Sequence, residues 1–332
     1  MVIIFHKKPT IIASSSVVGP LEKKSVFYSY FDEAVADERL SQKTNEQGQA
    51  KLIERAVQSA LNKSSLSNLE VDYFLSGDLV NQMTPTNFAA QQLAMSFIGM
   101  FSACATSVSS VIIAALLTEL NASQIAIAGA SSHHNATERQ FRYPILYGSQ
   151  KPKYAQWTVT AAGYVIVAQH QPNHPVIVSA TVGKVVDYKQ EDPFHMGAAM
   201  APAAFDTITQ HLKARNQKIV DYDMIFTGDL GKYGLQLLKS MLVESGVELK
   251  KPINIRDAGA EFYGDDERFQ AGASGAGCSA AVFFSYVLDQ LKTGRYKRVL
   301  LVATGSLLSP LSFQQGEMIP CTAHAIELEM GE

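Results

Sequence analysis

Two short stretches with one pattern decide the fold: DYFLSGDL at residues 72–79 and DMIFTGDL at residues 223–230. In each, an acidic residue comes before an apolar run of strand length, and glycine, aspartate and leucine follow it. Apolar runs bounded by turn residues in this way are typical of short buried strands. Each stretch also follows a segment of helical character, at residues 51–62 and 205–215. The same pattern therefore occurs twice in the same order.

The repeat continues through a cysteine, a helical stretch and a second apolar run. In the first copy, Cys104 precedes a helical stretch (105–120) and the strand-like run 125–131; in the second, Cys278 precedes a helical stretch and the run 299–306. The cysteine lies 25 positions before the glycine of the following strand in the first copy and 27 in the second. Two matched blocks in one order indicate an internal duplication.

Strands that alternate with helices imply β-α-β crossovers and buried parallel strands. Each copy then ends in a further extended run, at residues 164–168 and 326–328. The polar, turn-rich segment at 169–175 separates the copies. We therefore predict an α/β protein built of two similar halves, 1–170 and 171–332.

Composition excludes several classes of function. Hydrophobic residues make up 47% of the 332 residues and charged residues 18%, so the chain can form a large core. A net charge of −3 leaves no basic excess to neutralise phosphates, which argues against binding nucleic acid. Three widely spaced cysteines predict a reducing compartment, with neither disulfides nor a zinc site. No motif predicts a cofactor, and the N-terminus lacks the pattern of a secretory signal.

One segment has the length of a membrane span. No charged residue occurs from Leu79 to Thr118, and the part from Leu93 onward is largely apolar. Glycine, serine and threonine interrupt this part, however, and asparagine and glutamine precede it. We predict a pair of helices buried inside a protein core instead of a transmembrane helix.

Both cysteines of the repeat are candidates for chemistry. Cys104 lies in GMFSACATS (99–107), where unpaired amides at the start of a helix would favour a thiolate. The alternative is a small buried thiol that fills space. Cys278 follows the glycine-rich stretch GASGAG (272–277), which favours close packing of two helix starts over a phosphate-binding loop.

This organisation resembles the thiolase fold of thiolases and ketoacyl synthases. The motif SACAT (102–106) lies where condensing enzymes carry their nucleophile, and TAAGYVIV (160–167) resembles their Asp-Gly-Ala-Gly strand entry with threonine in place of the acid. The resemblance covers nearly the whole chain. It implies a five-layered α/β/α/β/α sandwich.

Four further blocks resemble one branch of that superfamily, the stage V sporulation protein AD family of spore-forming bacteria. They are SSHHNATERQFRYP (131–144), AQWTVT (155–160), MGAAMAPAA (196–204) and IPCTAHA (319–325). The resemblance implies a non-catalytic protein that binds dipicolinic acid (pyridine-2,6-dicarboxylate) or its calcium chelate. It also implies a peripheral subunit of a channel complex at the forespore or spore inner membrane, with other membrane subunits as partners and a homodimer as one possible assembly.

The partners of a catalytic cysteine are missing from their expected positions. A condensing enzyme needs an imidazole, and a second imidazole or an amide, beside its thiol. After the apolar run 224–226 the sequence reads Thr227-Gly228-Asp229, and near Gly272 it offers no histidine or asparagine. A carboxylate such as Asp229 would raise the pKa of the thiol instead. Cys321 lacks the glycine-rich setting of the second cysteine of thiolases.

The resemblance and the chemistry together give one set of expected ligand-binding residues: Cys104, His133, Arg139, Gln156, Thr158, His195, Asp229 and His324. Arg142 is a further cation close to Arg139. A dianionic ring needs cationic or amide donors and a flat wall. The alternatives are that Arg139 pairs with Glu138, that the histidines are structural, and that Trp157 belongs to the core.

Two other functions stay open at this point. The first is an acyltransferase or condensing enzyme of the ketoacyl-synthase type that works through Cys104. The second is a scaffold whose pocket is vestigial.

Overall fold

The computed structural model describes residues 1–141, 152–190, 192, 194–247, 249, 254–309, 311–312 and 315–331. Their first half contains β1 (Val2–Ile4), β2 (Thr10–Val18), β3 (Glu33–Ala34), α1 (Asn45–Ser64), β4 (Tyr73–Gly77), α2 (Thr84–Leu93), β5 (Phe97–Gly99), α3 (Thr106–Glu119), β6 (Ile125–Ser132), α4 (His134–Phe141), β7 (Trp157–Thr158) and β8 (Ala161–Ala168).

The second half repeats most of this order. It contains β9 (Pro175–Val182), α5 (Met196–Arg215), β10 (Met224–Thr227), α6 (Gly231–Glu244), β11 (Ile255–Asp257), α7 (Ala258–Glu261), β12 (Ala273–Ser274), α8 (Ala276–Val282), a π-helical turn (Phe283–Val287), α9 (Leu288–Lys292), β13 (Arg298–Ser306) and β14 (Cys321–Met330).

The duplication is visible in the order of the strands. From the junction of β2 with β9, the order is β2-β8-β6-β4-β5 in one direction and β9-β14-β13-β10-β11 in the other. The predicted parallel pairing is present where β4 joins β5 and β6, and where β10 joins β11 and β13. It is wrong for β8, β9 and β14, which pair with their sheet neighbours in antiparallel fashion, and for β2, which is antiparallel to β8 and β9 and parallel only to the short strand β3. The expected boundary at 170/171 lies in the connection between β8 and β9.

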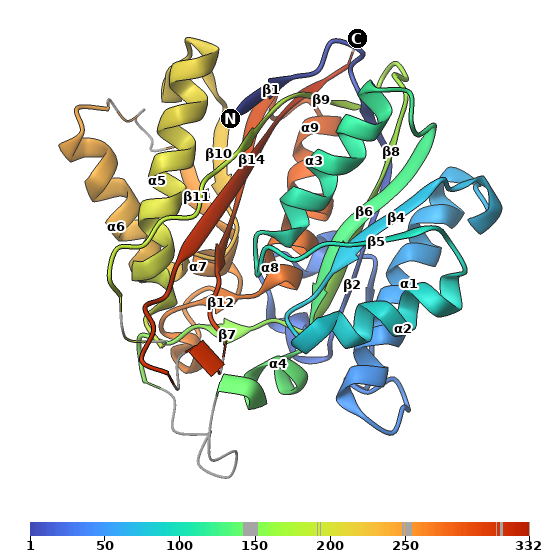
Figure 1. The fold of residues 1–332 in the computed structure, drawn as a ribbon, viewed down its shortest axis with the longest axis horizontal. Coiled ribbons are helices and arrows are strands. Elements are labelled where there is room, and N and C mark those ends of the chain that lie inside the picture. The colour runs from blue at the N-terminus through green and yellow to red at the C-terminus, as the bar shows by residue number, and fades with distance from the viewer. Residues whose placement is uncertain are drawn as a thin grey trace.

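The layers follow from which faces of the helices are apolar. Figure 1 shows α3 and α8 between the two halves of the sheet, with α1 and α2 outside the first half and α5 and α6 outside the second. The central helix α3 is buried on nearly every side, as its uncharged sequence requires. The outer helix α1 buries one face, which includes Leu52, Ile53 and Ala56. This arrangement confirms the predicted five-layered sandwich.

The uncharged segment before α3 is only partly helical. Helix α2 ends at Leu93, where Ala94 adopts a left-handed conformation, and the edge strand β5 follows before α3 begins. The predicted pair of helices is thus present as α2 and α3, and the strand β5, whose three residues are too short to show a period, lies between them. No helix in the described part of the chain is both long enough and apolar enough to span a membrane.

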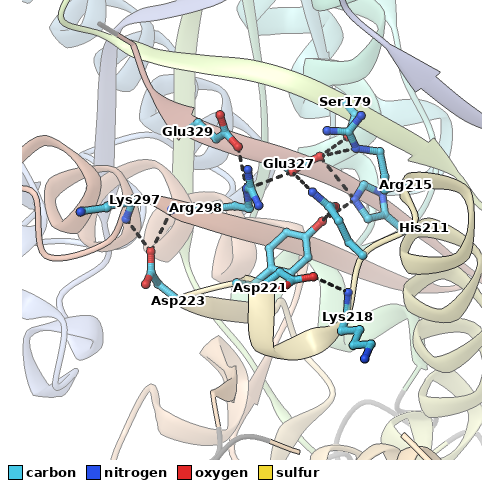
Figure 2. A network of polar contacts seen from close by, with 12 residues as sticks. Ser179, His211, Arg215, Lys218, Asp221, Asp223, Lys297, Arg298, Glu327 and Glu329 are labelled. Atoms are coloured by element: carbon cyan, nitrogen blue, oxygen red, sulfur yellow. Dashed lines mark hydrogen bonds and ion pairs between the residues drawn. The ribbon is translucent and has the colours of Figure 1, made fainter. Parts of the chain in front are cut away.

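A buried carboxylate joins the outer helix α5 to the sheet of the second half. Figure 2 shows Glu327 of β14 among Ser179, His211, Arg215 and Arg298. Its Oε2 accepts hydrogen bonds from Ser179 Oγ at 2.6 Å and from Arg215 Nε at 2.9 Å. These contacts lower the pKa of Glu327 to about 2 although burial opposes the shift. The network is therefore an ionic connection between a helix and two strands.

Candidate functional site

Cys104 lies on a tight turn immediately before α3. Ala103 has a φ of 48°, a left-handed conformation that costs about 1 kcal/mol or more for a residue other than glycine. The hydroxyl of Thr106, the first residue of α3, accepts from the Ser102 amide at 3.0 Å and donates to the Ala103 carbonyl at 2.7 Å. The turn leaves the Cys104 side chain 8% exposed, at the bottom of a cavity.

Asp229 reaches this thiol from the other half of the molecule. It follows β10, and its carboxylate accepts from Thr304 Oγ1 at 2.7 Å, from the Gly275 amide at 3.2 Å and from the Cys104 thiol. The adjoining turn is fixed by Asp257, which accepts from the amides of Leu230 and Gly231, both at 2.9 Å. Asp229 thus lies beside the thiol, at the place in the sequence where the resemblance to condensing enzymes implies an imidazole.

Burial and charge both oppose ionisation of the thiol. Burial raises the pKa of Cys104 well above its ordinary value, and the carboxylate of Asp229 raises it further, while the Gly275 amide lowers it. Burial also raises the pKa of Asp229 to about 6. The start of α3 does not make Cys104 a thiolate, because desolvation and the neighbouring carboxylate outweigh the helix amides.

Gly275 closes the site from the second half. Its amide donates to Asp229, and its φ of 110° is open only to glycine at little cost. A Cβ at this position would meet the Ser132 hydroxyl at 2.8 Å and the Thr158 methyl at 3.3 Å. The preceding strand β12 pairs with β7 of the first half, so that both halves build the same wall.

Above Cys104 lies a small cavity of about 70 Å³. Its described lining residues are mostly apolar or uncharged: Leu79, Phe101, Ala103, Cys104, Thr137, Glu138, Ala155, Gln156, Thr158, Phe194, Met196, Ser274, Gly275, Ser306 and Leu308.

Five of the eight expected residues lie at or beside this cavity. Cys104, Gln156 and Thr158 line it, and Asp229 lies behind Cys104. His195 stands between the lining residues Phe194 and Met196, and its ring packs against Tyr154 at 5.2 Å.

The other three lie elsewhere. His133 is buried, accepts from the Ala136 amide and contacts the Glu38 carbonyl at 3.1 Å. His324, on β14, accepts from the Gly183 amide at 3.3 Å, and burial lowers its pKa to about 4. Arg139 is exposed and pairs with Glu46 instead of Glu138. Arg142 lies outside the described residues.

Gln156 lines the cavity, and two backbone carbonyls fix its side chain. Its Nε2 donates to the backbone carbonyls of Asp229, at 2.5 Å, and Ala273, at 3.1 Å. The amide orientation therefore follows from its partners, and Oε1 has no hydrogen-bond partner among the described residues although the side chain is 4% exposed.

The sequence did not identify several lining residues. Phe194 and Leu308 lie in connections without periodicity, and Met196, the first residue of α5, belongs to a block that the sequence marks only by its resemblance. Ser306, in contrast, ends β13, and the carboxyl end of a strand in an α/β sheet is a usual place for a site. Glu138 was considered only as a partner for the arginines. In the described ranges, no group of histidine, cysteine or acidic side chains could hold a metal ion.

None of the histidines in the described part of the chain supplies a hydrogen bond to the Cys104 thiol, whose partners are Asp229 and the Gly275 amide. The other two cysteines are buried and lie outside the cavity lining. Cys278 is the third residue of α8, and its thiol lies 3.7 Å from the Gly228 carbonyl. This placement matches the expectation of close packing.

Solved structures with the same fold are enzymes of the thiolase superfamily. The human mitochondrial 3-ketoacyl-CoA thiolase in complex with CoA superimposes with a TM-score of 0.61 over 99% of this chain and 100% of that one, at 12% identity. The 3-oxoacyl-[acyl-carrier-protein] synthase III of Aquifex aeolicus gives 0.59 over 97% and 99%, also at 12% identity. At this level of identity the likeness concerns the fold.

Sequence comparison is more specific. The family model for stage V sporulation protein AD matches residues 1–329. The stage V sporulation protein AD of Bacillus subtilis (strain 168) is 42% identical over 328 residues, which are 98% of this chain and 96% of that protein. The chain therefore belongs to the stage V sporulation protein AD family, whose members are sporulation proteins, and it has the thiolase fold.

Proposed function

We propose that this protein binds dipicolinic acid, free or as its calcium chelate, in the cavity above Cys104 and does not convert it. The observation that carries the proposal is the contact between Cys104 and Asp229. A carboxylate in the place of an imidazole cannot leave the sulfur as a thiolate at neutral pH. The cavity is small, and its mostly apolar walls suit a flat ring.

The role in the spore is part of the same proposal. As a member of a sporulation family, the protein would act as a peripheral subunit of the channel that moves dipicolinate across the forespore inner membrane. Its partners would be the membrane subunits of that channel. Deletion of the gene should give spores without dipicolinate, and a variant that fills the cavity, such as Ala155→Trp, should give the same result while still being found with the spore inner membrane.

Calorimetry on the purified protein tests the binding. We expect one molecule of dipicolinate per chain and loss of binding in Ala155→Trp, with the fold verified by circular dichroism. The isomer pyridine-3,5-dicarboxylate serves as the ligand control and should bind much more weakly. No heat and no competition at millimolar dipicolinate would reject the proposal.

The retained cysteine supports a second candidate, an acyltransferase. Incubation with acyl-CoA followed by mass spectrometry separates the two functions. We expect no adduct on Cys104. A stable acyl adduct there, absent in Cys104→Ala, would favour an enzyme instead.

A further inference from the structure

Two residues that line the cavity have hydroxyl groups that the protein itself leaves without a partner. Thr137 of α4 and Ser306 at the end of β13 are 2% and 7% exposed. Neither hydroxyl oxygen has a hydrogen-bond partner among the residues that the structure describes. Folded proteins contain few buried polar groups of this kind, because each one costs stability. These two hydroxyls can find a partner only in the cavity, as water or as a ligand.

The hydroxyl of Thr137 differs from those of threonines in other helices of this protein. A helical threonine can donate back to the carbonyl four residues earlier, as Thr118 does in α3 at 3.0 Å and Thr209 in α5 at 2.7 Å. For Thr137 that carbonyl belongs to His133 and accepts from the Thr137 amide at 3.0 Å. The Thr137 hydroxyl makes no such bond. It is therefore a donor that α4 does not use.

The direction of the Ser306 side chain follows from its strand. Side chains two positions apart on a strand share a face, and Thr304 donates to Asp229 Oδ1 at 2.7 Å. Asp229 in turn accepts from the Cys104 thiol at the bottom of the cavity. Cys321, which pairs with Ser306 on β14, places its thiol near the Ser306 hydroxyl. A thiol is a weak hydrogen-bonding group, so a stronger acceptor in the cavity can take its place.

A carboxylate is the acceptor that suits two neutral donors of this kind, because its charge strengthens each hydrogen bond. Among the lining residues that the structure describes, none is a lysine or an arginine, and Arg139 pairs with Glu46. The acidic residue of the lining, Glu138, accepts from the Thr158 amide and from neither hydroxyl. The described wall thus presents Thr137 and Ser306 to a ligand as its buried, unpartnered donors.

We propose that Thr137 and Ser306 each donate a hydrogen bond to one of the two carboxylates of dipicolinate. The proposal rests on the proposed function and adds the groups that recognise the two acids. Thr137 belongs to the first half of the molecule and Ser306 to the second. Dipicolinate has one carboxylate on each side of its ring nitrogen, so it can accept from both halves at once. The pair of hydroxyls therefore favours a 2,6-diacid over a monoacid.

Calorimetry with dipicolinate tests the two donors. Thr137→Val keeps the shape of the side chain, and Ser306→Ala removes the hydroxyl alone. Each variant loses a hydrogen bond to a charged acceptor, so we expect the Kd to rise about ten- to hundredfold. In the double variant the two factors should multiply, because the hydroxyls serve separate carboxylates. Thr137→Ser restores a hydroxyl and should bind much more tightly than Thr137→Val.

Ser15→Ala is the matched control. Ser15 of β2 is fully buried and its hydroxyl also has no partner among the described residues, but it does not line the cavity. Its removal should leave the Kd for dipicolinate unchanged. Since an unpartnered hydroxyl stabilises nothing, none of the three single substitutions should lower the urea midpoint of the free protein.

A monoacid shows whether each hydroxyl serves its own carboxylate. Pyridine-2-carboxylate has the same ring, and in either single variant it can turn its one acid toward the hydroxyl that remains. We expect its Kd to stay close to that of the wild type in both single variants and to rise about tenfold or more in the double variant. A rise in both single variants as large as that for dipicolinate would contradict the assignment of one hydroxyl to each acid.

The remaining outcomes separate this proposal from the proposed function. If the wild type binds dipicolinate and both single variants bind it equally well, the hydroxyls hold only water, and the proposal is wrong while the proposed function stands. An equal loss of affinity in Ser15→Ala would also overturn the proposal, because the effect would not come from the cavity. Failure of the wild type to bind at millimolar dipicolinate would reject both.

Discussion

At the scale of single residues, the chemistry of the site depends on what stands opposite Cys104. The turn at Ala103, the hydroxyl of Thr106 and the amide of Gly275 still arrange the thiol as a nucleophile would be arranged. Asp229 changes the outcome because a carboxylate accepts the thiol hydrogen and stabilises the neutral thiol. Under the proposed function, the same side chains would hold a ligand without attacking it.

Asp229→Asn should make Cys104 more reactive. Above pH 6 the Asp229 carboxylate raises the pKa of the thiol, so its removal lowers that pKa. Each unit of that change is worth about a tenfold larger thiolate fraction. We expect alkylation of Cys104 by iodoacetamide at pH 8 to become several-fold faster, measured by mass spectrometry. Asp78→Asn, at the corresponding position of the first half, is the control. If alkylation of Cys104 were accelerated equally in that variant, the cause would be a general loosening of the fold and not the loss of the Asp229 carboxylate.

Gly275→Ala should destabilise the protein and close the site. The new methyl group would lie 2.8 Å from the Ser132 hydroxyl on a backbone with a φ of 110°. We expect a loss of about 2–4 kcal/mol in the free energy of unfolding by urea, together with loss of ligand binding. Gly294→Ala isolates the backbone contribution, because its φ is 74° with nothing within 4 Å of the added carbon. It should cost about 1 kcal/mol, and equal losses in the two variants would contradict the steric argument.

At the scale of elements, the hydrophobic pattern predicted the strands that have a buried apolar run. It failed for strand segments that form only because a neighbouring strand pairs with them. The duplicated runs became β4, β6, β10 and β13 because a continuous apolar run of that length fits a buried strand. β5 is too short to show a period, and it forms because β4 offers it an open edge. β14 begins at Cys321, before the predicted run, since Cys321 and Thr322 pair with β13.

The site was predicted in part for a similar reason. Strand ends and helix starts placed Cys104 and Asp229 correctly, because carboxyl ends of strands meet at one edge. Arg139 was misplaced with respect to the cavity because one residue turns a helix by about 100°. On α4, Thr137 and Glu138 face the cavity, while Arg139 faces α1 and pairs with Glu46. In a short polar helix, the sequence does not show which side chains face the protein and which face outward.

Glu327→Gln should weaken the connection of α5 to the sheet in Figure 2. The pKa of Glu327 is lowered from 4.5 to about 2 in the folded protein, so its stabilisation is present above the unfolded pKa and is lost as the pH falls from about 4.5 toward 2. The shift corresponds to about 3 kcal/mol. We expect the urea midpoint at pH 7 to fall accordingly, and much less at pH 3.

Glu329→Gln is the matched control for this prediction. Glu329 accepts from Nε of the same Arg298 at 2.6 Å but is a third exposed, so its loss should cost less than about 1 kcal/mol. Equal losses in the free energy of unfolding for the two variants would show that the burial of Glu327 adds nothing to the stability of the protein.

At the scale of the molecule, the two halves meet both in the sheet and around the site. β2 pairs with β9, β7 pairs with β12, and the hydroxyls of Ser107 in α3 and Ser279 in α8 lie 2.7 Å apart. The cavity above Cys104 takes walls from both halves, so its shape depends on how firmly they are joined. Duplication therefore produced one site at the interface and left a structural carboxylate, Asp78, at the corresponding position of the first half.

A buried acid at this interface makes the joining of the halves sensitive to pH. Glu22 Oε1 accepts from the Thr160 amide of the first half and from the Tyr263 hydroxyl of the second, both at 3.0 Å, while Oε2 has no partner among the described residues. Burial raises the pKa of Glu22 from 4.5 to about 7. The folded state thus holds a proton that the unfolded chain has released, so stability is lost as the pH rises from about 4.5 to 7.

Glu22→Gln should therefore stabilise the protein in alkaline solution and have little effect in acid. The amide keeps an acceptor for Thr160 and Tyr263 but carries no charge, so at pH 8 it avoids a burial cost of about 3 kcal/mol. We expect the urea midpoint of the variant to exceed that of the wild type at pH 8 and to equal it near pH 4.5. Glu244→Gln, at an exposed position of α6, should change neither midpoint. A variant less stable than the wild type at pH 8 would mean that the carboxylate of Glu22 holds the two halves together through its charge.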